Sequence, residues 1–323
     1  MATLSYIDAI RAGLFEEMRR DDSVVLIGED IGRYGGAFKA TKGLFDEFGE
    51  RRVLDAPISE SAIVGACIGA AIRGFRPVAE MQFADFVTCG FSQIVVNAAT
   101  FHYRLGVSVP IVVRCPAGGG VAAGPYHSRA VEAWFAHGPG LKVVVPATPA
   151  DAKGLMKSAI RDPNPVVFLE HEMMYGLEFD VPEVDDWLVP IGKARVRREG
   201  TDVTITAHSR MVGFALQAAE KLAEEGISCE VVDLRTLRPL DHETIVESVK
   251  KTSRLVSAEE GWGPMGVGAE VVARVIEHAF DYLDAPPMRV HQEDVPLPYA
   301  ANLEVLSLPG VDKIIKAVRA VMA

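Results

Sequence analysis

Long apolar runs, positive charge and paired cysteines are all scarce in this chain of 323 residues. No apolar stretch approaches the roughly 18 to 20 residues of a membrane-spanning helix, so we expect a soluble protein with no membrane partner. Lys and Arg number 33 against 44 Asp and Glu, which gives a formal net charge of −11. Phosphate binding needs clustered Lys and Arg, so we expect no nucleic-acid partner. The cysteines form no CxxC pair and stand in apolar runs, so we expect buried thiols at Cys67, Cys89, Cys115 and Cys229. Free thiols indicate a reducing compartment, and we expect the cytoplasm.

Signals of several other protein classes are missing as well. The first residues lack the apolar core of a signal peptide, and Asp8, Glu16 and Glu17 interrupt any transit-peptide pattern, so we expect neither. No GxGxxG motif follows an expected strand, and the chain has no GxxxxGK(S/T), HExxH or GxSxG motif. A nicotinamide-dependent dehydrogenase, a P-loop enzyme, a zinc protease and an α/β-hydrolase are therefore poorly supported.

Short runs rich in Val and Ile alternate with helical patterns along the chain. Continuous apolar runs such as VVLI and VVV suit strands buried on both faces, which indicates parallel sheets covered by helices and an α/β fold. Strands are expected at 23–30, 77–83, 110–116, 141–147, 165–170, 202–208, 229–234, 254–260 and 288–294. Helices are expected around 7–18, 59–73, 88–105, 149–161, 210–225, 241–251, 266–283 and 311–322.

The alternation is interrupted once, by an acidic and Pro-containing stretch. This stretch, LEFDVPEVDDWLVP at 177–190, is expected to be a linker. It divides the chain into an N-terminal domain at 1–176 and a smaller C-terminal α/β domain at 191–323.

A first candidate site lies in DAPISESAIVGACIGAAIRG, residues 55–74. Ser59 can cap the helix that follows, and Glu60 falls in its first turn, where the helix dipole favours a carboxylate. Small residues then recur at spacings of three and four, as at Gly65 and Gly69, which lets another backbone approach closely. Glu60 is either an ordinary first-turn carboxylate or a carboxylate held at the mouth of a subunit interface, and the residues alone leave both open.

Two further segments carry residues suited to ligand chemistry. In EMQFADF, residues 80–86, Phe83 and Phe86 stand at the junction of a strand and a helix, where α/β sheets bind ligands. They are either core aromatics or a platform for a flat heteroaromatic ligand. In the Gly-rich segment 115–140, His127 and His137 flank a short helix, and a histidine at this place is either an acid–base group or a hydrogen-bonded loop residue.

Taken together, these segments resemble one family over essentially the whole chain. The strings LIGEDIGRYGGAFKATKGL, DAPISESAIVGA, RPVAEMQFADF, HGPGLKVVVP, VVDLRTLRPLD and DVPLPYA occur in the family's order. The chain resembles the beta subunit of the first, thiamine-diphosphate-dependent component of 2-oxo acid dehydrogenase complexes, and sits closest to the pyruvate and acetoin members. The resemblance implies an N-terminal pyrimidine-binding domain and a C-terminal transketolase-type domain.

The resemblance also implies roles for particular residues. Glu60 would hydrogen-bond the pyrimidine nitrogen para to the amino group and so favour the imino tautomer of the cofactor. Phe86 would stack on the pyrimidine ring. His127 would handle protons or the dithiolane when the acyl group passes to a lipoyl arm; the family pattern YHSQS reads YHSRA here. A structural potassium ion would be held mainly by backbone carbonyls, around Val112, Ala159, Asp162 and Asn164.

Further expectations from the resemblance concern partners and substrate. The family forms heterotetramers of two alpha and two beta chains, in which an alpha-chain motif beginning GDG holds magnesium and the diphosphate. This chain has no GDG, so we expect it to be inactive alone. The expected reaction is oxidative decarboxylation of a 2-oxo acid, pyruvate first, with transfer to a lipoyl-bearing dihydrolipoamide acyltransferase. Acetoin cleavage, branched-chain 2-oxo acid decarboxylation and a catalytically silent scaffold remain as alternatives.

Overall fold

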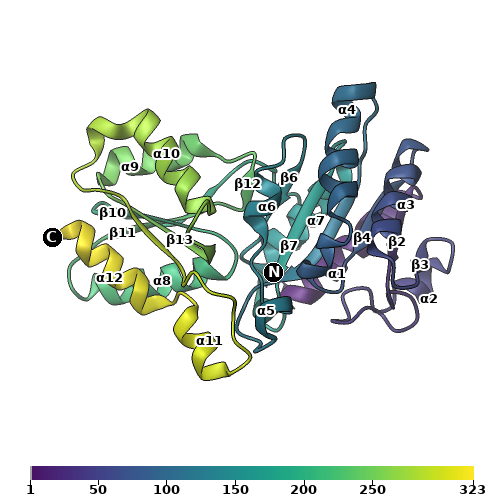
Figure 1. Ribbon diagram of the computed structural model, residues 1–323, viewed down its shortest axis with the longest axis horizontal. Helices are drawn as coiled ribbons and strands as arrows, with labels where there is room; N and C mark the ends of the chain where they lie inside the picture. The colour runs from purple at the N-terminus through teal and green to yellow at the C-terminus, as the bar shows by residue number, and fades with distance from the viewer. Residues whose placement is uncertain (1) are drawn as a thin grey trace. The chain divides into compact units, whose positions relative to one another are not determined.

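The computed structural model describes residues 2–323 and divides into two compact units (Figure 1). One unit contains the chain up to Ala117 together with Trp134–Ile191, and the other contains Gly118–Ala133 together with Gly192–Ala323. The Gly-rich segment 118–133 therefore belongs to the second unit, although the chain returns to the first unit after it.

The first unit is built on a parallel sheet in which its strands run in the order β6-β7-β5-β4-β2-β3. The strands are β2 (Val24–Gly28), β3 (Val53–Asp55), β4 (Arg76–Glu80), β5 (Val112–Ala117), β6 (Lys142–Val144) and β7 (Val166–His171). Strands β5 and β7 are buried along their whole length, as the continuous apolar runs predict.

Helices enclose this sheet and complete its core. They are α1 (Tyr6–Arg20), α2 (Leu44–Phe48), α3 (Glu60–Ile72), α4 (Ala99–Leu105) and α7 (Pro149–Arg161), while α6 (Glu132–Ala136) lies where the chain passes back from the second unit. Helix α1 packs along α7 and buries Ile10, Leu14 and Met18 completely, which confirms the expected amphipathic helix. Its N-terminus is capped by Ser5, whose hydroxyl accepts a hydrogen bond from the amide of Asp8.

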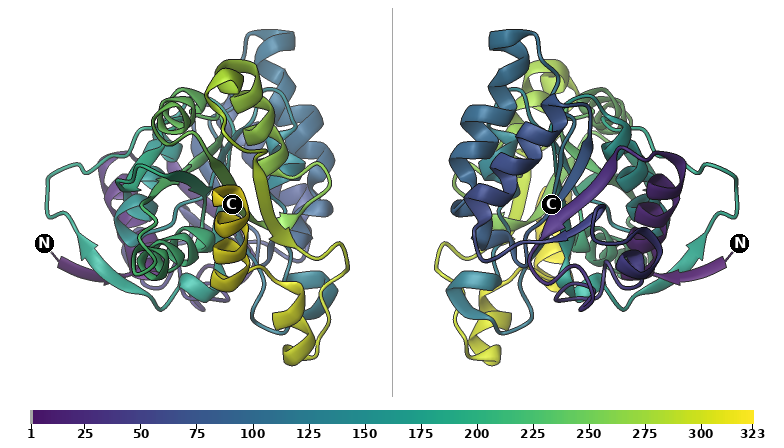
Figure 2. Two further views of the ribbon diagram at one scale, coloured as in Figure 1. Left: turned by 90° about the vertical axis from the view of Figure 1, so that its left-hand side faces the viewer. Right: turned by 90° about the vertical axis from the view of Figure 1, so that its right-hand side faces the viewer.

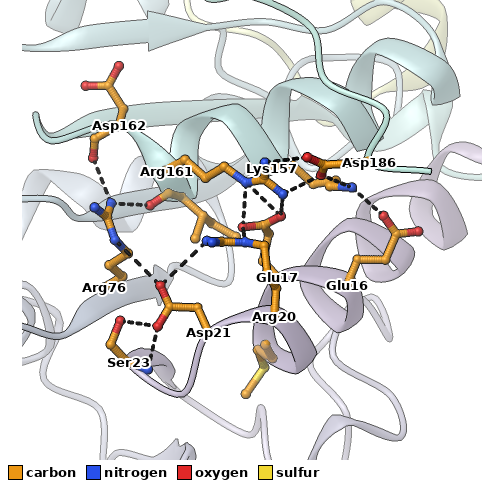
Figure 3. Close-up of polar contacts among 12 residues, drawn as sticks. Glu16, Glu17, Arg20, Asp21, Ser23, Arg76, Lys157, Arg161, Asp162 and Asp186 are labelled. Carbon is orange, nitrogen blue, oxygen red and sulfur yellow. Dashed lines mark hydrogen bonds and ion pairs between the residues drawn. The ribbon is translucent and has the colours of Figure 1, made fainter. Parts of the chain in front are cut away.

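The stretch expected to be a linker, 177–190, is structured and packs on the first unit. It contains β8 (Glu178–Val181), which pairs antiparallel with β1 (Ala2–Ser5), and Figure 2 shows these strands side by side at the N-terminus. Trp187 donates a hydrogen bond to the carbonyl of Ala150 over 2.9 Å, and Val189 is buried. Acidic composition does not make this stretch a free tether, because its charges meet basic groups of α7. Asp186 lies 3.1 Å from the ammonium group of Lys157 (Figure 3).

Two other expectations need correction. The helix expected at 88–105 begins a few residues later, after the 3-10 helix η1 (Ala84–Thr88), and its first part is a π-helix, η2 (Gln93–Ala98), that continues into α4. The expectation of four buried thiols is wrong for Cys89, which is exposed just after η1. The other three thiols are buried; burial raises the pKa of Cys67 to about 12 and that of Cys229 to about 11.

The second unit is a smaller α/β sandwich whose sheet has the order β14-β13-β10-β11-β9. Its strands are β9 (Arg195–Arg198), β10 (Val203–Ala207), β11 (Cys229–Asp233), β13 (Leu255–Trp262) and β14 (Met288–Gln292), with a further short strand β12 (Thr236–Arg238). Its helices are α5 (Gly124–His127), α8 (Arg210–Ala223), α9 (His242–Thr252), α10 (Val267–Ala279), α11 (Ala301–Ser307) and α12 (Val311–Met322). A 3-10 helix, η4 (Phe280–Tyr282), directly follows α10 in the chain. Helices α9 and α10 pack together on one face of the sheet, and α8 and α12 pack together on the other (Figure 1). Only β9 runs antiparallel, at the edge.

Candidate active site

Charged side chains gather at the carboxyl edge of the first unit's sheet. Gly28 at the end of β2 stands between Asp55 of β3 and Glu80 of β4, and Glu80 stands beside Arg114 of β5. Parallel sheets bind their ligands at this edge, because loops and helix N-termini converge there. The candidate residues of the first unit are found around this row.

Glu60 is the first residue of α3 and is half-buried. Its carboxylate lies in the first turn of a 13-residue helix, where the free amide groups favour negative charge. The expected Ser59 cap is wrong: the hydroxyl of Ser59 donates to the carbonyl of Pro57 over 2.9 Å and makes no cap hydrogen bond to the helix. The start of α3 is instead held by its backbone and by a second carboxylate.

That second carboxylate belongs to Glu29, which follows β2 directly and was not singled out from the sequence. Its Oε1 accepts a hydrogen bond from the amide of Ser59 over 3.4 Å, and its side chain is 7% exposed. Burial raises the pKa of Glu29, and the negative charge of Glu60 raises it further. Within residues 2–323, neither Glu29 nor Glu60 forms an ion pair. An acid immediately after a buried strand, as in LIGED, is the signal that could have pointed to it.

An aromatic turn lies against the same end of α3. Phe86 is in η1, three residues after the extended Phe83, and the two rings meet edge to face with centroids 6.1 Å apart. The chain then passes Gly90, where a Cβ would lie 3.4 Å from the carbonyl oxygen of Glu60. Gly90 thus lets the turn that carries Phe86 approach the first turn of α3. The ring of Phe86 is half-buried, so the expected strand–helix junction carries a partly exposed aromatic side chain.

A different group of charges lies deeper at this edge. Arg114 is 1% exposed and lies 2.5 Å from Glu80 and 2.5 Å from Glu170, while the hydroxyl of Tyr175 donates to Glu170 over 2.8 Å. Burial raises the pKa of Glu80, although Arg114 acts against this shift. These carboxylates already have a cationic partner, which makes them a structural network rather than a group open to a ligand.

The second unit carries His127 at the end of α5, where it is half-buried. The loop before it adopts left-handed backbone angles at Gly118 (φ 100°), Gly120 (φ 104°) and Ala122 (φ 55°). Gly124 has no room for a side chain, because a Cβ would lie 2.4 Å from the ring of Tyr299. His137 belongs to the first unit and is exposed.

The segment that carries His127 ends at a buried ion pair. Nε2 of His208, which is 2% exposed, lies 3.0 Å from Oε1 of Glu132. Burial alone would lower the pKa of His208, but the hydrogen bond and charge of Glu132, together with Glu259 and Asp233, raise it overall. A charged imidazole is therefore favoured here, and it fastens this end of the segment within the second unit.

The residues expected at a potassium site lie on three elements. Val112 opens β5, Ala159 is in the last turn of α7, and Asp162 and Asn164 form the turn that follows. The carboxylate of Asp162 accepts hydrogen bonds from the amide and the side chain of Asn164, both over 2.9 Å. Peptide oxygens at the C-terminus of a helix suit a cation in kind.

Basic side chains already bind the oxygen atoms of this turn. Arg76 donates to the carbonyls of Ile160 over 2.8 Å and Asp162 over 3.3 Å (Figure 3), and Lys142 pairs with the Asp162 carboxylate. Among residues 2–323, no group of three or more His, Cys, Asp and Glu side chains could hold a metal ion. The arrangement therefore gives a potassium ion no distinct side-chain site.

Family models match both units. The pyrimidine-binding domain of transketolase matches residues 2–178, and the C-terminal domain of transketolase matches residues 192–314. A solved structure described as a split-gene transketolase, an inactive beta4 tetramer, has a TM-score of 0.80 and 26% identity, and the match covers 99% of this chain and 98% of that one. These matches define a transketolase-type chain and confirm the fold class expected from the sequence.

Curated relatives narrow the class. The pyruvate dehydrogenase E1 component subunit beta of Rhizobium meliloti is 49% identical over 99% of this chain and 70% of its own length. The human mitochondrial pyruvate dehydrogenase E1 subunit beta is 48% identical over 97% and 89%, and the 2-oxoisovalerate dehydrogenase subunit beta of Bacillus subtilis is 50% identical over 99% and 98%. The chain belongs to the beta subunits of the first component of 2-oxo acid dehydrogenases. No helix within residues 2–323 is long and apolar enough to cross a membrane.

Proposed function

We propose that this chain is the beta subunit of a pyruvate dehydrogenase that decarboxylates pyruvate oxidatively and passes the acyl group to a lipoyl domain. One observation carries the catalytic part of the proposal. Glu60 and Glu29 form a pair of carboxylates without a cationic partner of their own at the ligand-binding edge of the sheet, and the turn that follows Phe86 approaches Glu60 at Gly90. A pyrimidine ring fits this combination, because a carboxyl group can hold a proton at a ring nitrogen while an aromatic side chain packs on the ring face.

Glu60 is proposed as the catalytic residue of this chain. When bound, thiamine diphosphate supplies the electron sink for loss of carbon dioxide from the 2-oxo acid. The Glu60 carboxyl would hold and relay a proton at the pyrimidine nitrogen para to the amino group. Glu29 is the second carboxylate of the pair, and burial together with the charge of Glu60 raises its own pKa. An amide in place of Glu60 could form a hydrogen bond but could not relay the proton.

Phe86 and His127 are proposed in two different roles. Phe86 would stack on the pyrimidine, since its ring is half-buried and the turn that follows it packs on α3 through Gly90. His127 would serve transfer of the acyl group to the lipoyl arm, as a group that can give or take a proton near neutral pH. The lipoyl arm would be carried by a dihydrolipoamide acyltransferase.

An alpha chain is the proposed partner, in a tetramer of two alpha and two beta chains. That chain would hold magnesium and the diphosphate, for which this sequence has no GDG motif. The small-residue face of α3 supports an interface: Ala62, Ala66 and Gly69 are exposed, and a Cβ built on Gly69 meets no atom within 4 Å. Small side chains on an exposed helix face allow another subunit to approach closely.

A potassium ion at the turn 161–164 remains part of the proposal, with peptide oxygens around Val112, Ala159 and Asp162 and the side chain of Asn164 as its ligands. Because Arg76 and Lys142 already bring positive charge to this turn, no step of the reaction is assigned to the ion.

The substrate is tested with the reconstituted enzyme. Purified alpha and beta chains with thiamine diphosphate, magnesium and a lipoyl domain are assayed on pyruvate, acetoin and 3-methyl-2-oxobutanoate. We expect the highest kcat/KM on pyruvate and no turnover by the beta chain alone. A preference for 3-methyl-2-oxobutanoate would favour the activity that the Bacillus subtilis relative is named for. No turnover on any of the three by a well-assembled tetramer would favour a silent scaffold.

A further inference from the structure

The loop that leads to His127 is fastened by two buried carboxylates of the second unit. Both oxygens of Glu304, on α11, accept loop amides: Oε1 accepts from Gly120 and Oε2 from Ala122, each over 3.0 Å. Oε1 of Glu260, in β13, accepts from the amide of Gly119 over 2.6 Å. Glu304 is 2% exposed and Glu260 is 6% exposed.

Glu304 depends on this loop for the stability of its charge. A buried carboxylate is costly unless hydrogen bonds or a cation compensate it. Within the described residues Glu304 forms no ion pair, so its carboxylate oxygens depend on the two loop amides as hydrogen-bond donors. Hydrogen bonds from amides to an ionised carboxylate are about twice as strong as neutral ones. We call the two hydrogen bonds from Gly120 and Ala122 to Glu304 the clamp; they stabilise both the carboxylate and the loop.

The backbone of the loop needs such a clamp. Ala122 adopts a left-handed φ of 55° between glycines that are also left-handed, a conformation that an alanine leaves readily when nothing holds it. The amide of Ala122 is one of the two groups that Glu304 binds. Beyond it, the amide of Ala123 donates to the buried hydroxyl of Ser128 over 3.2 Å, which closes the short turn of α5 around His127.

We propose that Glu304 is a positioning residue for His127. By binding the amides of Gly120 and Ala122 it fixes the loop conformation, and the loop fixes where α5 presents the imidazole. The proposal rests on the proposed role of His127 in acyl transfer. It assigns a function in the reaction to α11, a short helix with no residue among the candidates identified from the sequence.

The first test measures the clamp without reference to activity. Glu304→Gln keeps the shape of the side chain but turns an amide NH₂ group toward a loop N–H. In the reconstituted tetramer, hydrogen–deuterium exchange of the peptide 118–127 should become at least about tenfold faster. The matched control is Glu293→Gln, which removes an exposed carboxylate of the same unit paired with Lys313 and should leave this peptide unchanged. Unchanged exchange in a folded Glu304→Gln tetramer overturns the proposal, whatever His127 does.

The second test is a double-mutant cycle with His127→Ala. Acylation of a lipoyl domain and decarboxylation with an artificial electron acceptor are both measured. Glu304→Gln alone should slow lipoyl acylation by at least about tenfold more than decarboxylation, and should change acylation by less than about twofold once His127 is Ala. If Glu304 were merely structural, Glu304→Gln would lower both activities equally, and its effect on acylation would be the same with His127 or Ala at position 127. Either result would overturn the proposal.

The two ways of failing are distinguishable. If His127→Ala itself slows both assays equally, the proposed role of His127 fails, and the positioning role falls with it. If His127→Ala is selective for acylation while Glu304→Gln is not, only the positioning role fails. Should Glu304→Gln not assemble, Glu304→Asp keeps the charge but reaches one amide at most. It should show the same selectivity for acylation with a smaller loss, and equal losses in both assays overturn the proposal.

Discussion

Two pairs of carboxylates lie at the same edge of one parallel sheet, and their surroundings give them different roles. Glu80 and Glu170 enclose the guanidinium of Arg114, deep in the first unit. Glu29 and Glu60 lie at the ends of β2 and α3, where no described cationic side chain pairs with them. The first pair has a cation supplied by the fold itself, whereas the second has none, and this is why we propose the second pair as the one that meets the ligand.

The comparison shows that residue type and sheet position do not define a catalytic carboxylate. Burial raises the pKa of both Glu80 and Glu29, but Arg114 opposes the shift at Glu80, while the charge of Glu60 adds to the shift at Glu29. A glutamate with a fixed cation stabilises the protein. We propose that the glutamates without such a cation serve proton transfer.

The largest expected effect is on turnover, at Glu60. Glu60→Gln should keep the fold and the tetramer and lose about 10²- to 10⁴-fold in kcat, the usual contribution of an acid–base group. Steady-state assays of the reconstituted enzyme measure this. The matched variant Glu47→Gln, which removes an exposed carboxylate paired with Arg19, should turn over at the wild-type rate.

For the pair formed by Glu80 and Glu170, which Arg114 neutralises, the main effect is expected on stability rather than on turnover. Arg114→Met leaves two buried carboxylates without their cation, which should cost about 3–5 kcal/mol of stability. Denaturant unfolding of the beta chain measures it, with Arg19→Gln at an exposed pair as a control that should change little. If Arg114→Met were as stable as wild type, the contrast between the two pairs would lose its physical basis.

A smaller effect is expected at Phe86, on cofactor binding. Phe86→Ala should weaken thiamine diphosphate binding by about 1 kcal/mol or more, because a stacked aromatic contact is lost. Isothermal titration of the reconstituted tetramer gives the dissociation constant. Phe280→Ala, at an exposed site in the second unit, should not change it. An unchanged dissociation constant in Phe86→Ala would show that Phe86 is a core aromatic residue and does not stack on the cofactor.

The smallest expected effect concerns the buried pair of the second unit and depends on pH. The folded pKa of His208 is raised, so its pair with Glu132 contributes stability that is fully present below the unfolded pKa of about 6.5 and is lost as pH rises through the folded pKa. His208→Gln should therefore lower the unfolding midpoint most in mildly acidic buffer and least in alkaline buffer. His137→Gln, at an exposed histidine, serves as the control. A pH-independent difference between wild type and His208→Gln would contradict the ion pair.

Much of this arrangement was predictable from local sequence. Apolar runs located the strands on both sides of the site, and the spacing of Phe83 and Phe86 placed them at a strand–helix junction. The family strings then supplied the fold class, which the comparisons confirm.

Other features depend on pairings that local sequence does not encode. Glu80 and Glu170 meet Arg114 across 34 and 56 residues of chain, and Glu29 meets Ser59 across 30. The Gly-rich segment joined the second unit because Glu260 and Glu304, far along the chain, bind its amides. Local patterns also misjudged the cap at Ser59, since the same hydroxyl can bond within its own turn.

The central claim, that Glu60 controls a proton at the pyrimidine, is tested most directly by hydrogen–deuterium exchange at the thiazolium carbon of the bound cofactor. This exchange precedes any reaction with substrate, so it is independent of the substrate and of lipoyl transfer. In a well-assembled Glu60→Gln tetramer saturated with cofactor, we expect the exchange rate to fall in parallel with turnover, by about 10²- to 10⁴-fold. Exchange at the wild-type rate would contradict the assignment of Glu60 and, with it, the catalytic role proposed for this chain.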